Sequence, residues 1–209
     1  MDLFELKKEQ LKLARKISLK DDFSTIKTIG GAVCVQLGNK LLAMIVVCGL
    51  PSFKIIEKKS YVLNNPLSYK PGFLAYREMP AIIEAYNQLE EEPDLLFVMG
   101  AGVLHPRKIG IASHLGLALN KATIGIQEKL IIGNAEKGKI FLDDEMLGFE
   151  MKTKEHSNPI FASPGYLVSM GTVLNIIPKT IIHPHKIPEP LYLARKIAKK
   201  LVKTKNKEA

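Results

Sequence analysis

The chain has 209 residues, which suits one domain with a sizeable hydrophobic core. Hydrophobic residues make up 46% of it and charged residues 24%, and these values exclude disordered, collagen-like and low-complexity classes. The formal net charge is +9, but residues 191–209 hold seven Lys and Arg against one Glu. Because most of the surplus lies in one terminal segment, charge alone supports a nucleic-acid partner only weakly.

The sequence favours a cytoplasmic protein. No apolar run reaches the roughly 20 residues that a membrane span requires, and the first residues are charged throughout, unlike a signal peptide. Cys34 and Cys48 flank a hairpin turn at Gly38-Asn39 that places them five positions out of register, roughly 16 Å apart. A disulfide requires Cα atoms within about 7 Å, so we expect two free, buried thiols.

The hydrophobic pattern predicts helices and strands in alternation after an initial group of strands. In chain order we expect a helix over 2–20, strands over 29–37, 40–48 and 53–63, a loop over 64–72, a helix that starts at Pro80, a strand over 95–99, a helix over 109–119, a strand over 122–126, a hairpin over 139–142 and 147–151, a strand over 159–163, a helix over 169–177 and a basic terminal helix after residue 190.

This order predicts a single α/β domain with a mixed sheet flanked by helices, the layout of the ribonuclease-H-like fold. We expect the domain to span residues 1–190. Residues 191–209 then form a basic C-terminal helix and tail, packed on the domain or extending from it. An apolar stripe up to Val202 would let this helix dock on the core.

Several segments resemble those of one known family. Residues 68–78 read SYKPGFLAYRE, similar to PYIPGxLxFRE, and residues 93–116 read PDLLFVMGAGVLHPRKIGIASHLG, similar to PDxxxxDGxGxxHPRxxGxASHxG. Shorter matches follow at residues 123–126, 159–165 and 187–190. The family is endonuclease V. The resemblance implies a ribonuclease-H-like fold, Mg²⁺ as cofactor and cleavage of nucleic acid near a deaminated base, chiefly hypoxanthine (inosine).

The positions that match the family's metal site are mostly substituted. Its two metal-binding aspartates fall on Val33 and Met99, its lysine on Glu128, and an acidic or histidine position on Arg195, while Glu78 keeps its carboxylate. Mg²⁺ binds through oxygen, which neither valine nor methionine supplies. We therefore expect no bound Mg²⁺. Arg195 could pair with Glu78 and fill the charge vacancy.

The positions that match the family's substrate-reading parts look better preserved. Tyr69, with Lys70 and Pro71, occupies the wedge that the family inserts at the lesion, although one proline of that loop is replaced by Ser68. The remaining expected nucleic-acid-binding residues are Gly72, Leu74, Gly110 and Ile111 in the base pocket, Gly100 and Gly102 in the glycine segment, and His105, Arg107, Lys108 and His114 near phosphates and the pocket rim.

Three functions remain open at this stage. The first is a monomeric protein that binds DNA or RNA with deaminated bases but has impaired or lost cleavage, a pseudoenzyme. The second is an active nuclease whose metal site is rebuilt on Glu78 and Glu128, with His105, Asp143 and Asp144 as further candidates. The third is a non-catalytic scaffold whose basic tail binds an acidic partner. Two structural roles compete with these: Tyr69 could simply pack on the sheet edge, and Glu78 could pair with Arg77, Lys70 or Arg195.

Overall fold

A computed structural model describes the backbone of residues 2–208 and the side chains of residues 2–205. Residues 1 and 209, the outer limits of the predicted domain and tail, lie outside the described residues. The strands are β1 (Thr28–Leu37), β2 (Lys40–Gly49), β3 (Lys54–Leu63), β4 (Leu95–Met99), β5 (Thr123–Gln127), β6 (Asn134–Glu136), β7 (Lys139–Leu142), β8 (Glu145–Met151) and β9 (Ile160–Tyr166). The helices are α1 (Leu3–Ala14), α2 (Leu74–Tyr86), α3 (Ile111–Leu119), α4 (Met170–Lys179) and α5 (Glu189–Glu208).

The strands form one mixed sheet in the order β3-β2-β1-β4-β5-β9-β8-β7-β6. β4 runs parallel to both β1 and β5, and the other neighbouring pairs are antiparallel. The expected mixed α/β architecture is therefore confirmed. The carboxyl ends of the three parallel strands meet at one edge of the sheet, which is where side chains for a site can gather.

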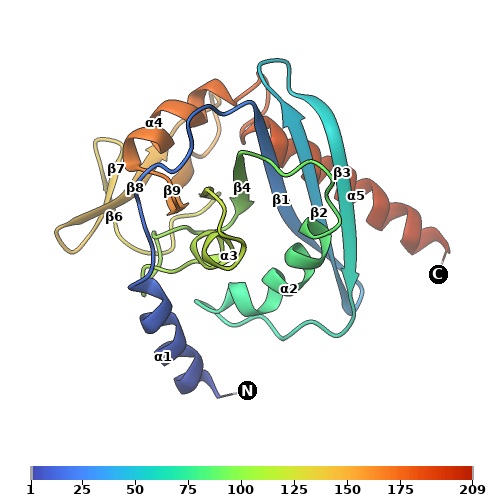
Figure 1. Ribbon diagram of the computed structural model, residues 1–209, viewed down its shortest axis with the longest axis horizontal. Helices are drawn as coiled ribbons and strands as arrows, with labels where there is room; N and C mark the ends of the chain where they lie inside the picture. Colours follow the sequence, from blue (N-terminus) through green and yellow to red (C-terminus); the bar gives the residue numbers. More distant parts are fainter. Residues whose placement is uncertain (1, 209) are drawn as a thin grey trace.

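Helices cover both faces of the sheet (Figure 1). α2 and α3 pack on one face, where Ile82 and Leu115 join a buried cluster with Leu96 and Val98. α5 packs on the opposite face across β1 and β2. Its first turns are part of the core, because Leu191 is fully buried among the apolar side chains of the sheet. No helix within residues 2–208 is long and apolar enough to cross a membrane.

The register confirms the expected separation of the two cysteines. Cys34 pairs with Ala43 and Cys48 with Ile29, five positions apart along β1. Their side chains lie in the two separate clusters on opposite faces of the sheet. Both thiols are free.

Three details differ from the sequence prediction. The first helix ends at Ala14 rather than at residue 20. Pro80 lies inside α2 instead of at its start, because Ala75 and Ala81 belong to one continuous buried face that outweighs the hydrogen bond lost at the proline. β6 was not predicted, since its three residues are all exposed and carry no hydrophobic pattern.

A direct backbone contact holds the loop after β4 against the sheet. A Cβ atom on Gly125 would lie 2.2 Å from the Gly102 nitrogen, and one on Gly102 would lie 2.1 Å from the Pro164 oxygen. The Gly102 N–H also donates to Ser163 Oγ at 3.0 Å. Side chains at these two positions would push the loop away from β5 and β9.

We expect Gly125→Ala to lower the free energy of unfolding by about 1–3 kcal/mol or more, since the new methyl meets rigid backbone. Gly171→Ala in α4 is the matched control, because its Cβ would have no atom closer than 3.7 Å. It should be neutral or stabilise by up to about 1 kcal/mol. Urea unfolding of both variants measures the difference, and equal stabilities would contradict the close-contact assignment.

Candidate functional site

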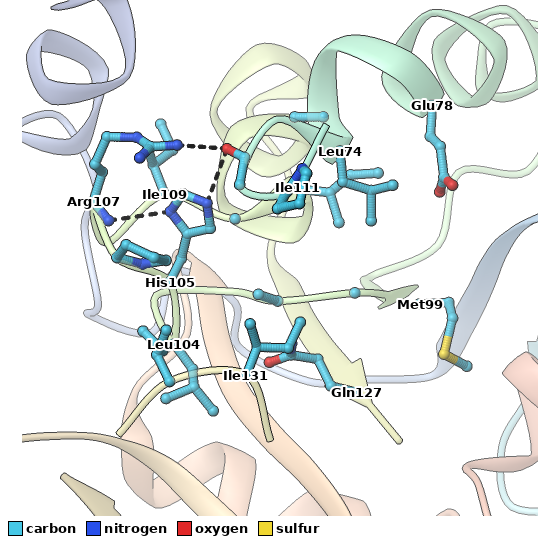
Figure 2. Close-up of a pocket in the computed structure, with 18 of the residues that line it drawn as sticks. Leu74, Glu78, Met99, Leu104, His105, Arg107, Ile109, Ile111, Gln127 and Ile131 are labelled. Carbon is cyan, nitrogen blue, oxygen red and sulfur yellow. Dashed lines mark hydrogen bonds between the residues drawn. The ribbon is translucent and has the colours of Figure 1, made fainter. Parts of the chain in front are cut away.

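A cavity of about 560 Å³ opens at the edge where β4 and β5 end. Its volume lies within the range of about 300–1,000 Å³ typical of small-molecule sites. Figure 2 shows its walls, with Leu74 and Ile111 facing Gln127 and Ile131 across the opening. Most residues that the sequence predicts for binding line it: Tyr69, Pro71, Gly72, Leu74, Gly100, His105, Arg107, Gly110 and Ile111. Three of the substituted or retained metal-site positions line it as well: Glu78, Met99 and Glu128.

Two residues predicted to bind nucleic acid, Lys70 and Gly102, lie near the cavity but do not line it. Lys70 is exposed, next to the cavity mouth. Gly102 is buried against β9, so its role in the structure is the close backbone contact described above.

Lys108 and His114 also point away from the cavity. Lys108 is exposed and forms an ion pair with Glu145. His114 is buried in α3, where its ring meets the Tyr76 ring edge-on at 5.4 Å.

The carbonyl oxygen of Gly72 is the meeting point of three donors. Arg107 Nη2 donates to it at 2.6 Å, Gln10 Nε2 at 3.1 Å and His105 Nε2 at 3.2 Å. His105 Nδ1 accepts the Arg107 backbone N–H, which leaves the ring proton on Nε2. Burial, with the nearby Arg107 charge, lowers the pKa of His105 to about 4, so the imidazole is neutral at pH 7. These bonds tie α1, the loop before α2 and the loop after β4 together.

Tyr69 projects from this anchored loop. Its side chain is 60% exposed, so it does not pack on the sheet edge. The loop is held on both sides of it, by the Gly72 bonds and by Arg77, whose Nη1 donates to the Leu67 carbonyl. An exposed aromatic ring at a cavity mouth can stack on a flat ring system.

Glu78 is half-buried on the cavity wall and has no ion-pair partner among the described side chains. Burial raises the pKa of its carboxyl to about 7, and Arg77 opposes this only in part. Cys34 Sγ contacts the Glu78 backbone carbonyl at 3.9 Å, and burial also keeps the pKa of that thiol well above its usual value.

Arg195 pairs with Glu128 and not with Glu78, which corrects the pairing considered from the sequence. Its Nη2 lies 2.6 Å from Glu128 Oε2 and 3.3 Å from Met99 Sδ. The physical reason is the sheet: Arg195 reaches the strand ends from α5 on one face, and Glu78 stands on α2 on the other face. The hydrogen bond from Arg195 lowers the pKa of Glu128, and Lys186 Nζ lies 3.8 Å from its other oxygen.

These side chains do not match the needs of Mg²⁺. Ala32 pairs with Val98, so Val33 and Met99 stand level on adjacent parallel strands, and neither offers an oxygen. Val33 is 2% exposed within the core. Glu128 is already bound by Arg195. Within residues 2–205, whose side chains are described, no group of three or more His, Cys, Asp or Glu side chains is arranged to hold a metal ion.

The other candidates for a rebuilt metal site lie apart from these groups. Asp143 and Asp144 are exposed in the turn between β7 and β8 and do not line the cavity. His105 has both ring nitrogens in hydrogen bonds to backbone groups.

Among the polar residues of the cavity that sequence reasoning missed, Gln10 and Gln127 are the buried ones, and Lys129 is exposed. Gln10 is 1% exposed, although it belongs to an otherwise exposed amphipathic helix. Gln127 is 7% exposed and ends an apolar strand. A polar residue at the end of a buried strand is a signal that could have identified Gln127.

Comparison with known proteins gives one consistent match. A sequence profile of the family described as Endonuclease V matches residues 11–196. Endonuclease V of Dictyoglomus turgidum is 34% identical over 206 residues, which are 95% of this chain and 90% of that protein. The crystal structure of Bacillus subtilis endonuclease V has a TM-score of 0.90 at 27% identity and covers 100% of this chain and 95% of that one.

A solved complex is also similar. Ciona intestinalis endonuclease V, in complex with a 24-mer DNA that contains an inosine followed by a ribo-adenosine, has a TM-score of 0.88 at 26% identity. The match covers 97% of this chain and 98% of that one.

The raised pKa of Glu78 has a measurable effect on stability. Between its ordinary value of 4.5 and about 7 the folded state binds more protons than the unfolded state, so stability falls as pH rises through this window. Glu78→Gln removes this pH dependence. Relative to the wild type, the free energy of unfolding of the variant should therefore rise by roughly 2–3 kcal/mol between pH 4.5 and pH 8. Urea unfolding from about pH 4.5 to 8 measures it. Glu84→Gln, exposed on the same helix, is the control, and parallel pH curves for Glu78→Gln and wild type would contradict the prediction.

Proposed function

Since the chain belongs to the endonuclease V family, we propose that it binds nucleic acid at a deaminated purine, without the family's Mg²⁺-dependent cleavage. The observation that carries the proposal is the composition of the cavity. The residues matched to a base pocket and a wedge gather around it, and an Arg195–Glu128 ion pair occupies positions matched to the family's metal site.

Binding is supported by the shape and chemistry of the cavity. Enzymes that act on a base in a strand turn it out of the stack into a fitted pocket, and a deaminated base costs less to turn out than a paired one. Leu74, Ile109 and Ile111 provide apolar surface for a flat base. Tyr69 stands exposed at the mouth, where it can fill the gap left in the stack.

Loss of cleavage is supported by the donor set. Mg²⁺ keeps several waters and is usually held by one or two carboxylates. Glu78 is the one carboxylate kept from the expected set, and the positions beside it carry Val33 and Met99. Arg195 places a positive charge close to Met99, where a cation would otherwise be needed. A divalent ion would have to compete with that guanidinium.

The ion pair also disfavours a rebuilt metal site. Glu128 Oε2 is 2.6 Å from Arg195 Nη2, so this carboxylate would have to give up a strong charge-assisted bond to bind metal. No contact among the described residues favours this second function.

The test is binding and cleavage measured together on matched single-stranded DNA and RNA oligonucleotides, with inosine or adenosine at one position. We expect tighter binding to the inosine strand, affinity that falls steeply as salt rises, and no cleavage products with Mg²⁺ or Mn²⁺. Cleavage at rates typical of endonuclease V would overturn the loss of catalysis. Absence of binding even at low salt would overturn the whole proposal in favour of a scaffold.

We expect Tyr69→Ala to weaken binding of the inosine strand by about 5- to 150-fold, the range for one lost base–aromatic contact. Stability should change little, because the ring is 60% exposed. Phe4→Ala is the matched control, since Phe4 is an aromatic residue of 61% exposure outside the cavity. Fluorescence anisotropy titrations compare the variants, and equal losses from both would contradict a specific role for Tyr69.

A further inference from the structure

Gln127 places an amide group on the floor of the cavity. It is the last residue of β5, two positions after Gly125, so its side chain leaves the sheet on the same face as the close backbone contact. Figure 2 shows its amide oxygen beside Ile131, across the cavity from Leu74 and Ile111. The residue is 7% exposed, so the amide belongs to the cavity and not to the outer surface.

The amide oxygen of Gln127 has no hydrogen-bond partner among the described residues, although it is buried. Leaving such an acceptor unpaired costs about 1–3 kcal/mol, and buried polar groups in folded proteins are nearly always paired. Much of the cavity lining is apolar, with Leu104, Ile109 and Ile131 among the side chains that cannot donate. The oxygen is therefore an acceptor without a donor, on a side chain that lines a cavity of ligand size.

The other polar groups that line the cavity make no hydrogen bond to this oxygen. His105 and Arg107 direct their N–H groups to Gly72 and Gln10, and the exposed ammonium of Lys129 does not bond it either. Buried polar atoms without a partner also occur on Tyr86, Ser113 and His114, but none of these three lines the cavity. Gln127 thus differs from the rest of the described chain in pairing an unmet acceptor with a cavity.

We infer that Gln127 Oε1 accepts a hydrogen bond from the ring N–H of the bound base and so selects purines protonated at N1. This inference rests on the proposed function. Hypoxanthine carries a proton on N1 next to its carbonyl group, whereas adenine has a lone pair there. With the amide in the orientation seen in the structure, an adenine in the same position would set a lone pair against the amide oxygen, and both groups would remain unpaired after losing water.

We predict that the cavity selects hypoxanthine by rejecting adenine, the base from which hypoxanthine is formed by deamination. Sites that hydrogen-bond a ligand group reject analogues that lack it, because the buried partner is then left unpaired. Gln127 would discriminate deaminated adenine from adenine at the one ring atom where deamination adds a proton. Guanine also carries a proton on N1, so this contact alone does not exclude it.

The test measures affinity for strands that differ in one base: inosine, adenosine, or 1-methylinosine, whose methyl group replaces the N1 proton. In the wild type we expect inosine to bind most tightly. Gln127→Met keeps the side-chain length and removes the acceptor. It should lower inosine affinity by about 5- to 20-fold and raise adenosine affinity, because the oxygen no longer opposes the adenine lone pair, so that the ratio between them collapses.

Three comparisons make the result specific. Gln127→Glu keeps an oxygen acceptor and should retain more of the preference for inosine over 1-methylinosine than Gln127→Met does. Gln88→Met, at an exposed glutamine after α2, should change neither affinity. Tyr69→Ala should lower inosine and adenosine affinities together, because stacking does not depend on the N1 proton.

The outcomes separate this inference from the function beneath it. A wild type that prefers inosine, with the full preference kept in Gln127→Met, overturns the role of Gln127 alone. Equal wild-type affinity for inosine and 1-methylinosine does the same and needs no variant. A wild type that does not prefer inosine over adenosine overturns the proposed function and this inference together.

Discussion

The site depends on one contact between backbones, that of Gly102 with Gly125. Because neither residue has a side chain, the loop after β4 lies directly on β5 and reaches the Pro164 carbonyl of β9. This contact sets the distance between two walls of the cavity, since Gly110 continues the loop and Gln127 continues the strand. A pocket for a flat ring requires such parallel walls, and it is formed here before any ligand arrives.

A second constraint fixes the mouth. The Gly72 carbonyl accepts bonds from Gln10 in α1 and from His105 and Arg107 in the loop after β4, two segments that lie far apart in the chain. Because His105 is neutral, its ring adds no positive charge beside the guanidinium of Arg107. Tyr69 therefore projects from a loop whose backbone is already ordered, which reduces the entropy that binding has to overcome.

The fold could be predicted from the sequence to a large extent. The Gly38-Asn39 turn between two apolar runs determines the first hairpin and its register, and this in turn separates Cys34 from Cys48. Pro80 shows the limit of local rules, because a helix begins before it when its buried face continues through it. β6 has no apolar side to reveal it.

Only those residues of the site that belong to short recognisable motifs could be predicted from the sequence. The segments around Tyr69 and Gly110 place their residues on the cavity as expected. The partner of Arg195 could not be deduced from the sequence, because Glu78 and Glu128 both lie far from Arg195 in the chain. Only the folded sheet, which stands between α5 and α2, separates Arg195 from Glu78. Gln127 remained hidden for a related reason: an unpaired acceptor exists only once the surrounding side chains are in place.

The ion pair of Glu128 with Arg195 restricts which mutational paths are open to this protein. A lysine introduced alone at position 128 would place a second positive charge next to Arg195. An acidic residue introduced alone at position 195 would place a second negative charge next to Glu128. Either single substitution therefore brings like charges together. A lone aspartate at 99 would be neutralised by the arginine that now touches Met99 Sδ at 3.3 Å. Each charge of the Arg195–Glu128 pair therefore disfavours a single substitution at the other position. Only a simultaneous exchange of both residues avoids leaving two like charges together.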